Sequence, residues 1–243
     1  MRIYLYDTVT STNDVLKEKA MSGEPEGSVV VARAQTHGRG RYGRNWLSAL
    51  DLGLYTSILL RPPAQFPAGL LALASGLAAA KAINRRVTST CTLKWPNDVL
   101  LHDRKIAGIL VETHVKNSET LFVIVGIGIN LHHGPSDLAL VDAPATSMVM
   151  AGCRAMDQDV LLQSLLKNFW REYAGLARKD GRERLLKRWR KSCGHRQKPV
   201  KIRNDREIIS GIFVDVDESG AALVELSTGE IVRTCTGEFT VQE

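Results

Sequence analysis

The amino-acid sequence predicts an α+β fold, in which a mixed β-sheet with helices is followed by a small β-barrel, on three observations. β-Branched and apolar runs typical of strands alternate with helical periodicity as far as Lys191. Past Gly194 the chain offers short strand-like runs separated by turn residues. With 243 residues, 44% of them hydrophobic, the chain can fill one large core and a small appendage. We therefore expect a main domain over residues 1–194 and a C-terminal barrel over residues 195–243.

The N-terminal part of the main domain is expected to hold one helix among strands. After a short first strand, Ser11 opens a helical pattern. Ser11 and Asp14 have the spacing of a capping box, and Gly23 is a plausible stop. Strand-like runs over residues 29–34 and 52–60 follow, with a basic loop between them. A loop bracketed by strands belongs to a packed domain rather than to a disordered tail.

The rest of the chain mixes both element types. A helix is expected over residues 67–85, followed by three strands over residues 92–101, 105–115 and 120–131. The apolar face of residues 159–177 predicts a long amphipathic helix, and a short basic helix ends near Lys191. Beyond it, strands are expected over residues 200–203, 208–216, 221–226 and 230–234.

Charge and cysteine content limit the class of protein. The formal net charge is +6, but thirteen Lys or Arg lie between Arg178 and Arg206, so the remainder is slightly acidic. This basic stretch is either a solvated helix face with a domain junction or a docking surface for an acidic partner. The four cysteines form no C-x-x-C pair, which argues against a zinc site or a disulfide framework. No secretion signal or membrane span is recognised, and we expect a cytoplasmic protein.

A basic loop carries the strongest chemical signal. The stretch QTHGRGRYGRNW, residues 35–46, combines three glycines and three arginines, with no acidic residue between Glu26 and Asp51. Arginine side chains suit phosphates and carboxylates, and glycines let the backbone approach a ligand closely. Because the Gly-Lys-Ser/Thr ending of a Walker A loop is missing, the arginines would act as side-chain clamps. A mobile, solvated surface loop is the alternative interpretation.

Three further motifs follow. The run Lys94-Trp95-Pro96-Asn97-Asp98 brings a cation, an aromatic ring, an amide and a carboxylate together, although a strand with a proline bulge is equally consistent. In the apolar run 105–112, Gly108 would open a slot beside the strand, unless it marks a bulge or barrel corner. The run 126–130, GIGIN, lacks the third glycine of a dinucleotide fingerprint, whereas Asn130 at the end of a buried strand needs a polar partner.

Together these motifs resemble the catalytic and C-terminal domains of biotin protein ligase over nearly the whole chain. The family pattern G-R-G-R-x-G-R-x-W matches residues 38–46, K-W-P-N-D matches 94–98, K-x-A-G-I-L matches 105–110, and G-x-G-I-N matches 126–130. Ser11-Thr12-Asn13 is similar to the biotin-contacting segment of the family, and Ala145-Thr146-Ser147 to its adenylate-side segment. The resemblance implies a class II synthetase-like catalytic domain followed by an SH3-like barrel.

The activity implied by the resemblance is that of an ATP-dependent biotin-[acetyl-CoA carboxylase] ligase. Biotin and Mg-ATP would give biotinyl-5'-AMP and pyrophosphate, and a lysine of a biotin carboxyl carrier protein or domain would then take the biotinyl group. Joining a carboxylate to the α-phosphate brings two anions together, so cations must neutralise both. Lys105, Arg39 and Arg41 are the expected catalytic residues.

The binding residues are likewise implied by the resemblance. Those expected to hold biotin are Ser11, Thr12, Asn13, Gln35, Gly38, Arg39, Arg41, Lys105, Gly108 and Gly126. Those expected to hold ATP or the adenylate are Arg41, Arg44, Trp46, Lys94, Asn97, Asp98 and Asn130, with Trp46 flanking the adenine. Mg²⁺ would arrive with ATP, and Asp98 is the one candidate protein ligand for it. The glycine-rich loop can close over the adenylate and exclude water.

Two positions in the loop depart from the family pattern. His37 stands where a small residue is usual and Tyr42 where arginine is frequent, which bears on loop packing and adenylate retention. Because the motifs begin at the first strand, we expect no N-terminal winged helix and no operator binding. Strand edges could support a homodimer or the docking of the acceptor.

Two other functions remain open at this point. A lipoate or octanoate ligase would share the fold and reaction type, but those families lack the arginine loop. An RNA-binding module could use the three arginines beside Tyr42 and Trp46, with the basic stretch as a second contact. That interpretation leaves the motifs at residues 94–98 and 105–110 unexplained.

Overall fold

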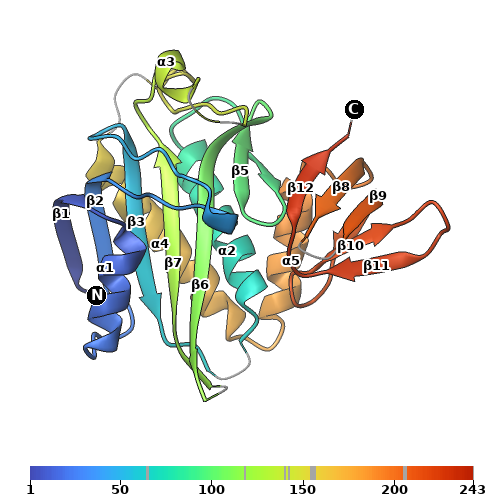
Figure 1. Ribbon diagram of the computed structural model, residues 1–243, viewed down its shortest axis with the longest axis horizontal. Coiled ribbons are helices and arrows are strands. Elements are labelled where there is room, and N and C mark those ends of the chain that lie inside the picture. The colour runs from blue at the N-terminus through green and yellow to red at the C-terminus, as the bar shows by residue number, and fades with distance from the viewer. Residues whose placement is uncertain are drawn as a thin grey trace.

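The structure is a computed structural model that describes residues 1–63, 66–117, 119–139, 141, 143–153, 157–204 and 207–242. Figure 1 shows a large sheet with helices and a smaller sheet beside it. The elements in chain order are β1 (Ile3–Val9), α1 (Thr12–Met21), β2 (Val29–Gln35), a 3₁₀ turn (Arg41–Gly43), β3 (Gly53–Leu60), α2 (Ala68–Asn84), β4 (Thr92–Lys94), β5 (Asp98–Leu101), β6 (Arg104–Lys116), β7 (Glu119–Asn130), α3 (Pro135–Leu138), α4 (Gln158–Leu176), α5 (Gly181–Ser192), β8 (Pro199–Arg203), β9 (Ile208–Val216), β10 (Ala222–Glu225), β11 (Ile231–Thr234) and β12 (Glu238–Val241).

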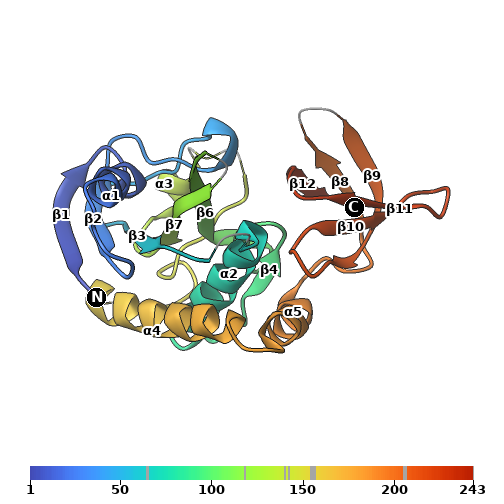
Figure 2. The same ribbon diagram turned by 90° about the horizontal axis from the view of Figure 1, so that it is seen from below.

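The large sheet has seven strands in the order β1-β2-β3-β7-β6-β5-β4. β1 and β2 run parallel, and the other neighbouring pairs are antiparallel. Figure 2 shows α2, α4 and α5 on one face of this sheet, with α1 and the basic loop on the other. The basic loop therefore lies on the face of the sheet opposite α2, α4 and α5.

Helix α2 explains the Ala-rich run of the sequence. Its buried residues include Leu70, Ala74, Ala78 and Ile83, each at most 1% exposed. The helix packs against β6 on one side and against α4 and α5 on others. A helix enclosed on several sides is apolar nearly all round, and small alanine side chains allow the close approach.

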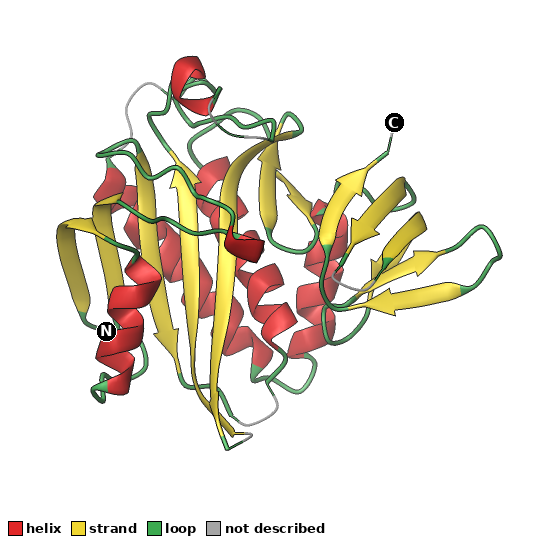
Figure 3. Cartoon of the chain, in the orientation of Figure 1, coloured by secondary structure: helices red, strands yellow, loops and turns green. Residues whose placement is uncertain are grey.

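The small sheet is antiparallel, with strand order β11-β10-β9-β8-β12, as the predicted small C-terminal β-domain requires (Figure 3). It is joined closely to the large sheet. The Trp95 indole N–H donates to the carbonyl of Gly220 at 3.0 Å, and Leu93 forms a parallel bridge with Cys193. Phe213 belongs to the same continuous hydrophobic core as Leu93 and Trp95. The two sheets therefore share a core.

Most predicted elements are confirmed, and three details differ. Residues 92–101 form the hairpin β4–β5 rather than one strand, and β12 was not predicted. The capping box at Ser11 is wrong, because the Ser11 side chain makes no cap bond and Asp14 instead pairs with Arg39. Helix α1 ends before Gly23, which has φ +90°, as expected. Asp205 and Arg206, at the end of the basic stretch, lie outside the described residues.

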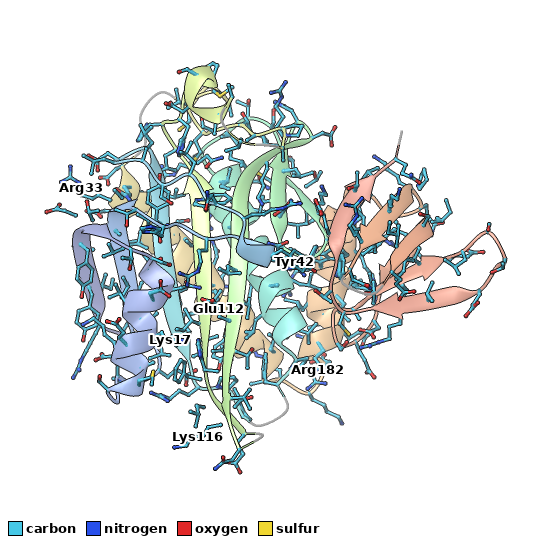
Figure 4. The ribbon with its side chains drawn as sticks, viewed as in Figure 1. Lys17, Arg33, Tyr42, Glu112, Lys116 and Arg182 are labelled. Atoms are coloured by element: carbon cyan, nitrogen blue, oxygen red, sulfur yellow. The ribbon has the colours of Figure 1, made fainter. Side chains whose placement is uncertain are left out.

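The basic stretch includes the whole of α5, on which Figure 4 labels Arg182. Part of its charge is paired within the protein: Arg184 bonds Asp180, Arg188 bonds Glu172, and Arg190 bonds Asp215. Among the described residues, no helix is long and apolar enough to cross a bilayer.

Candidate active site

A cavity of about 740 Å³ brings the four sequence motifs together. Its walls come from the start of α1, the end of β2, the basic loop, the β4–β5 turn, β6 and β7. The segment after α3 and residues 237–240 of the small sheet complete it. Elements far apart in sequence thus meet at one concave site, the arrangement typical of a small-molecule pocket.

The basic loop is fastened to the small sheet. Arg41 donates to the Gly237 carbonyl at 3.2 Å and to Thr236 Oγ1 at 2.8 Å, while the Tyr42 hydroxyl lies 2.7 Å from the same Thr236 oxygen. Arg44 forms an ion pair with Glu238. Tyr42, which departs from the family pattern, therefore packs as part of this connection, and Figure 4 shows it at the loop beside the small sheet.

The β4–β5 turn points its polar groups in different directions. Lys94 and Asp98 are opposite each other in the backbone register of the hairpin, and the Trp95–Pro96 bond is cis. The Asn97 side chain donates to the carbonyl of Ile109 at 2.7 Å, which fixes the turn to β6. The Trp95 ring is 1% exposed and turned toward the small sheet. Trp95 is part of the cavity lining, as the motif predicts, but its indole N–H is directed to the small sheet.

Cations outnumber carboxylates in the part of the cavity around Lys105. Lys105 Nζ lies 2.6 Å from Asp98 Oδ1, and burial lowers the pKa of Lys94 from its usual value. Burial likewise lowers the pKa of Arg41, against a smaller opposing effect of Asp98. Cationic groups that are partly removed from water and have few carboxylate partners favour the entry of an anion.

Arg39 is held apart from this cationic group. Its guanidinium forms two bonds of 2.6 Å with Asp14 and lies 3.9 Å from Glu112. The hydrogen bond to Asp14 raises the pKa of Arg39 and lowers that of Asp14. An arginine held bidentately by a carboxylate is fixed in orientation, so Arg39 lies beside α1 in the cavity wall.

At glycines of β6 and β7, side chains from the basic loop and from α1 pack directly against the strand backbone. A Cβ at Gly128 would lie 2.5 Å from Trp46, and one at Gly108 2.8 Å from Trp46 and 3.0 Å from Lys105 Cε. A Cβ at Gly126 would lie 2.5 Å from Asn13 Oδ1. The slot predicted at Gly108 exists, and the Trp46 ring lies over it in this structure. Gly126 acts on the cavity through Asn13.

The other end of the cavity is lined by neutral polar groups. The Thr12 backbone N–H donates to Gln35 Oε1 at 2.8 Å, and Gln35 Nε2 donates to Ser48 Oγ at 2.8 Å. Asn13 Nδ2 donates to Glu112 Oε2 at 2.5 Å. Thr12 and Asn13 are each 4% exposed. Hydrogen-bonding groups this well fixed suit a polar, uncharged part of a ligand.

Asn130 has the partner that its position predicts. Its amide donates to the carbonyl of Thr146 at 3.0 Å, and the Met148 N–H donates to the Asn130 carbonyl at 3.1 Å. Lys105 donates its own backbone N–H to Pro144 at 2.9 Å. The segment 144–148 is thereby fixed beside Lys105, so the Asn130 side chain supports the cavity wall as well as lining it.

The structure places nearly all predicted site residues in the cavity wall. Those that line it are Ser11, Thr12, Asn13, Gln35, Arg39, Arg41, Arg44, Trp46, Lys94, Asn97, Asp98, Lys105, Gly108, Gly126 and Asn130. Gly38 is not part of the lining: it lies at the base of the loop, where a Cβ would meet Ser48 Oγ at 2.4 Å. The wall formed by residues 237–240 was not predicted, since β12 is short and its sequence carries no distinctive motif.

Two observations bear on which ligands fit. The Trp46 indole N–H is buried and has no hydrogen-bond partner among the described residues, so a donor is available inside the cavity. Within the described part of the chain, no three His, Cys, Asp or Glu side chains come together as a metal site.

Comparison with known proteins identifies the family. Residues 5–130 match the Biotin/lipoate A/B protein ligase family, and residues 197–241 match the Biotin protein ligase C terminal domain. The chain is 34% identical over 238 residues to the bifunctional ligase/repressor BirA of Escherichia coli, covering 96% of this chain and 72% of that protein. The chain belongs to the biotin protein ligase family.

Further members of the family support this membership. The biotin–[acetyl-CoA-carboxylase] ligase of Mycobacterium tuberculosis is 32% identical over 235 residues, covering 91% of this chain and 82% of that protein. The biotin protein ligase of Aquifex aeolicus, solved with biotin and ATP, superposes with a TM-score of 0.81 at 30% identity. That comparison covers 99% of this chain and 98% of the Aquifex chain, so the fold match includes both the large and the small sheet.

Proposed function

We propose that the protein activates biotin with ATP to biotinyl-5'-AMP and transfers the biotinyl group to a lysine of a biotin carboxyl carrier domain, such as that of acetyl-CoA carboxylase. The observation that carries this proposal is that one cavity combines neutral polar groups, at Thr12, Asn13 and Gln35, with the cationic groups of Arg41, Lys94 and Lys105. Biotin has the same combination, with a neutral ring system at one end and a carboxylate at the other.

In the first step, a biotin carboxylate oxygen attacks the α-phosphorus of ATP, and the bond to the bridging oxygen of pyrophosphate breaks. Lys105 and Arg41 would neutralise the carboxylate and the α-phosphate as they approach. Arg44 and Lys94 would hold the departing phosphates. In exchange for these anions, Lys105 would leave Asp98 and Arg44 would leave Glu238.

The second step needs an amine from outside the chain. The acceptor lysine would attack the acyl carbon of the mixed anhydride, AMP would leave with the electron pair of the broken bond, and the amine would lose a proton. Until then the basic loop, tied to Thr236, would exclude water from the anhydride. We assign activation to residues 1–194 and closure of the cavity to residues 195–243.

Magnesium fits this scheme as a companion of ATP. Its ligands are oxygen atoms, and Mg²⁺ in nucleotide sites is commonly held by phosphates and one or two carboxylates. Asp98 would supply the carboxylate once Lys105 turns to the substrate. The ion would add positive charge to the phosphates.

The choice of acid is tested by incubating the protein with ATP and Mg²⁺ and either biotin, lipoate or octanoate. Mass spectrometry then measures the acyl-adenylate. Formation with biotin alone supports the proposal, and formation with lipoate would keep the reaction type and change the substrate. If no acid reacts and the protein binds RNA with a steep salt dependence, the nucleic-acid alternative replaces the ligase.

A further inference from the structure

Behind the neutral polar end of the cavity lies Glu112, a carboxylate on β6 with no assigned role. Figure 4 labels it in the middle of the large sheet. Glu112 is not part of the cavity lining. It accepts a hydrogen bond from Asn13 Nδ2 at 2.5 Å, and Arg39 Nη2 lies 3.9 Å away. Resting on the proposed function, we propose that Glu112 is a positioning residue that sets the hydrogen-bond polarity of the pocket for the biotin ring urea.

The argument begins with the orientation of the Asn13 amide. An ionised carboxylate accepts hydrogen bonds and donates none, so the Asn13 group facing Glu112 must be the NH₂. The Asn13 oxygen then faces Ser57 Oγ at 2.5 Å, and an amide oxygen also only accepts. The single Ser57 hydroxyl proton is therefore committed to Asn13.

The same reasoning extends to Thr12. Ser57 Oγ lies 2.7 Å from Thr12 Oγ1, and this contact needs a proton. Since Ser57 has given its proton to Asn13, the proton in this contact comes from Thr12. The Thr12 hydroxyl lies 3.2 Å from its other acceptor, Gln35 Oε1, so the shorter contact with Ser57 takes the proton. One acceptor thus orders a chain of donors that runs from Thr12 through Ser57 and Asn13 to Glu112. Ser57 is 0% exposed, so no solvent water can reverse its bonds.

The ordered chain of hydrogen bonds leaves one donor and one acceptor that a ligand can use. The second Asn13 Nδ2 proton is free to donate, and the lone pairs of Thr12 Oγ1 are free to accept. A cyclic urea presents a carbonyl oxygen and N–H groups side by side, so it needs one donor and one acceptor. Both residues line the cavity, whereas Ser57 and Glu112 lie behind them.

The substitution Glu112→Gln tests this role, because glutamine keeps the shape of the side chain and can donate. With glutamine, the Asn13 amide can turn over and the donor chain can run in either direction. We expect biotin to bind roughly 10- to 100-fold more weakly, the range for loss of a hydrogen bond to a charged group, with ATP affinity unchanged. Glu119→Gln, at the exposed start of β7, is the matched control and should bind biotin as the unaltered protein does.

Isothermal titration calorimetry with biotin and with ATP, on Glu112→Gln, Asn13→Ala and the double variant, separates the outcomes. If Glu112 acts through Asn13, the double variant loses little more affinity than Asn13→Ala alone. Additive losses, or an unchanged dissociation constant for biotin in Glu112→Gln, would overturn the inference. Failure of the unaltered protein to bind biotin would instead overturn the proposed function on which it rests.

Discussion

Adding one methyl group at Gly126 should disable the biotin end of the cavity. The Cβ of Gly126→Ala would lie 2.5 Å from Asn13 Oδ1 and 3.2 Å from Asn13 Cγ, well inside van der Waals contact. Asn13 must move away, and its bonds to Glu112 and Ser57 cannot both survive. Loss of the bond to the charged Glu112 alone would cost about 1.5–3 kcal/mol, or roughly 10- to 150-fold in the dissociation constant for biotin.

The assay is calorimetric titration with biotin, accompanied by titration with ATP and by urea unfolding. Gly175→Ala, in helix α4, adds the same methyl group where no atom lies within 4 Å, and it should leave biotin affinity unchanged and stabilise the helix by about 0.5–1 kcal/mol. ATP affinity should be retained in both variants, because Trp46 is not displaced. A Gly126→Ala protein that is folded and binds biotin within twofold of the unaltered protein would refute the reasoning.

Three further predictions follow from the contacts of single side chains. Lys105→Ala should slow single-turnover adenylation roughly 100- to 1,000-fold while the fold remains. The control is Lys81→Ala, at an exposed position of α2. Normal adenylation would remove Lys105 from the catalytic group. Thr236→Val removes the hydroxyl that holds the basic loop and should speed release of the adenylate about tenfold. Filter binding measures the release rate, with Thr228→Val as the control. Equal release rates in the two variants would mean that the Thr236 contact does not retain the adenylate. Burial lowers the pKa of His195 to about 3, so the unfolded chain binds a proton more readily, and stability should fall by about 2 kcal/mol from pH 7 to pH 5. His195→Phe should remove that part of the pH dependence in urea unfolding, and an unchanged slope would contradict the assignment.

The sequence predicted the order of elements well because local patterns determine them. The continuous apolar run of β7 and the amphipathic face of α4 are both visible in residues that are close together in the sequence. The resemblance to biotin protein ligase identified the cavity lining through short motifs with fixed spacing. Gly126 shows the limit of such transfer, since its neighbour in the structure is Asn13, which lies more than one hundred positions earlier in the sequence.

Contacts between distant parts of the chain were not predictable from local pattern. The Ser11–Asp14 spacing suggests a capping box, but Asp14 is taken by Arg39 from the folded loop, because a bidentate ion pair competes successfully with a cap bond. The closure of the cavity by Thr236 to Glu238 likewise depends on how the small sheet docks. The burial of Trp95 follows from the same docking, since its partner Gly220 lies in the small sheet.

Exchange of labelled pyrophosphate into ATP tests the central claim most directly. The purified protein is incubated with ATP, Mg²⁺ and labelled pyrophosphate, with biotin, lipoate or octanoate added separately. Exchange that depends on biotin, and not on the other two acids, is the predicted result, because the neutral end of the cavity is matched to the ring urea and the cationic end to the carboxylate. A folded protein that catalyses no exchange with any of the three acids would contradict the proposed function.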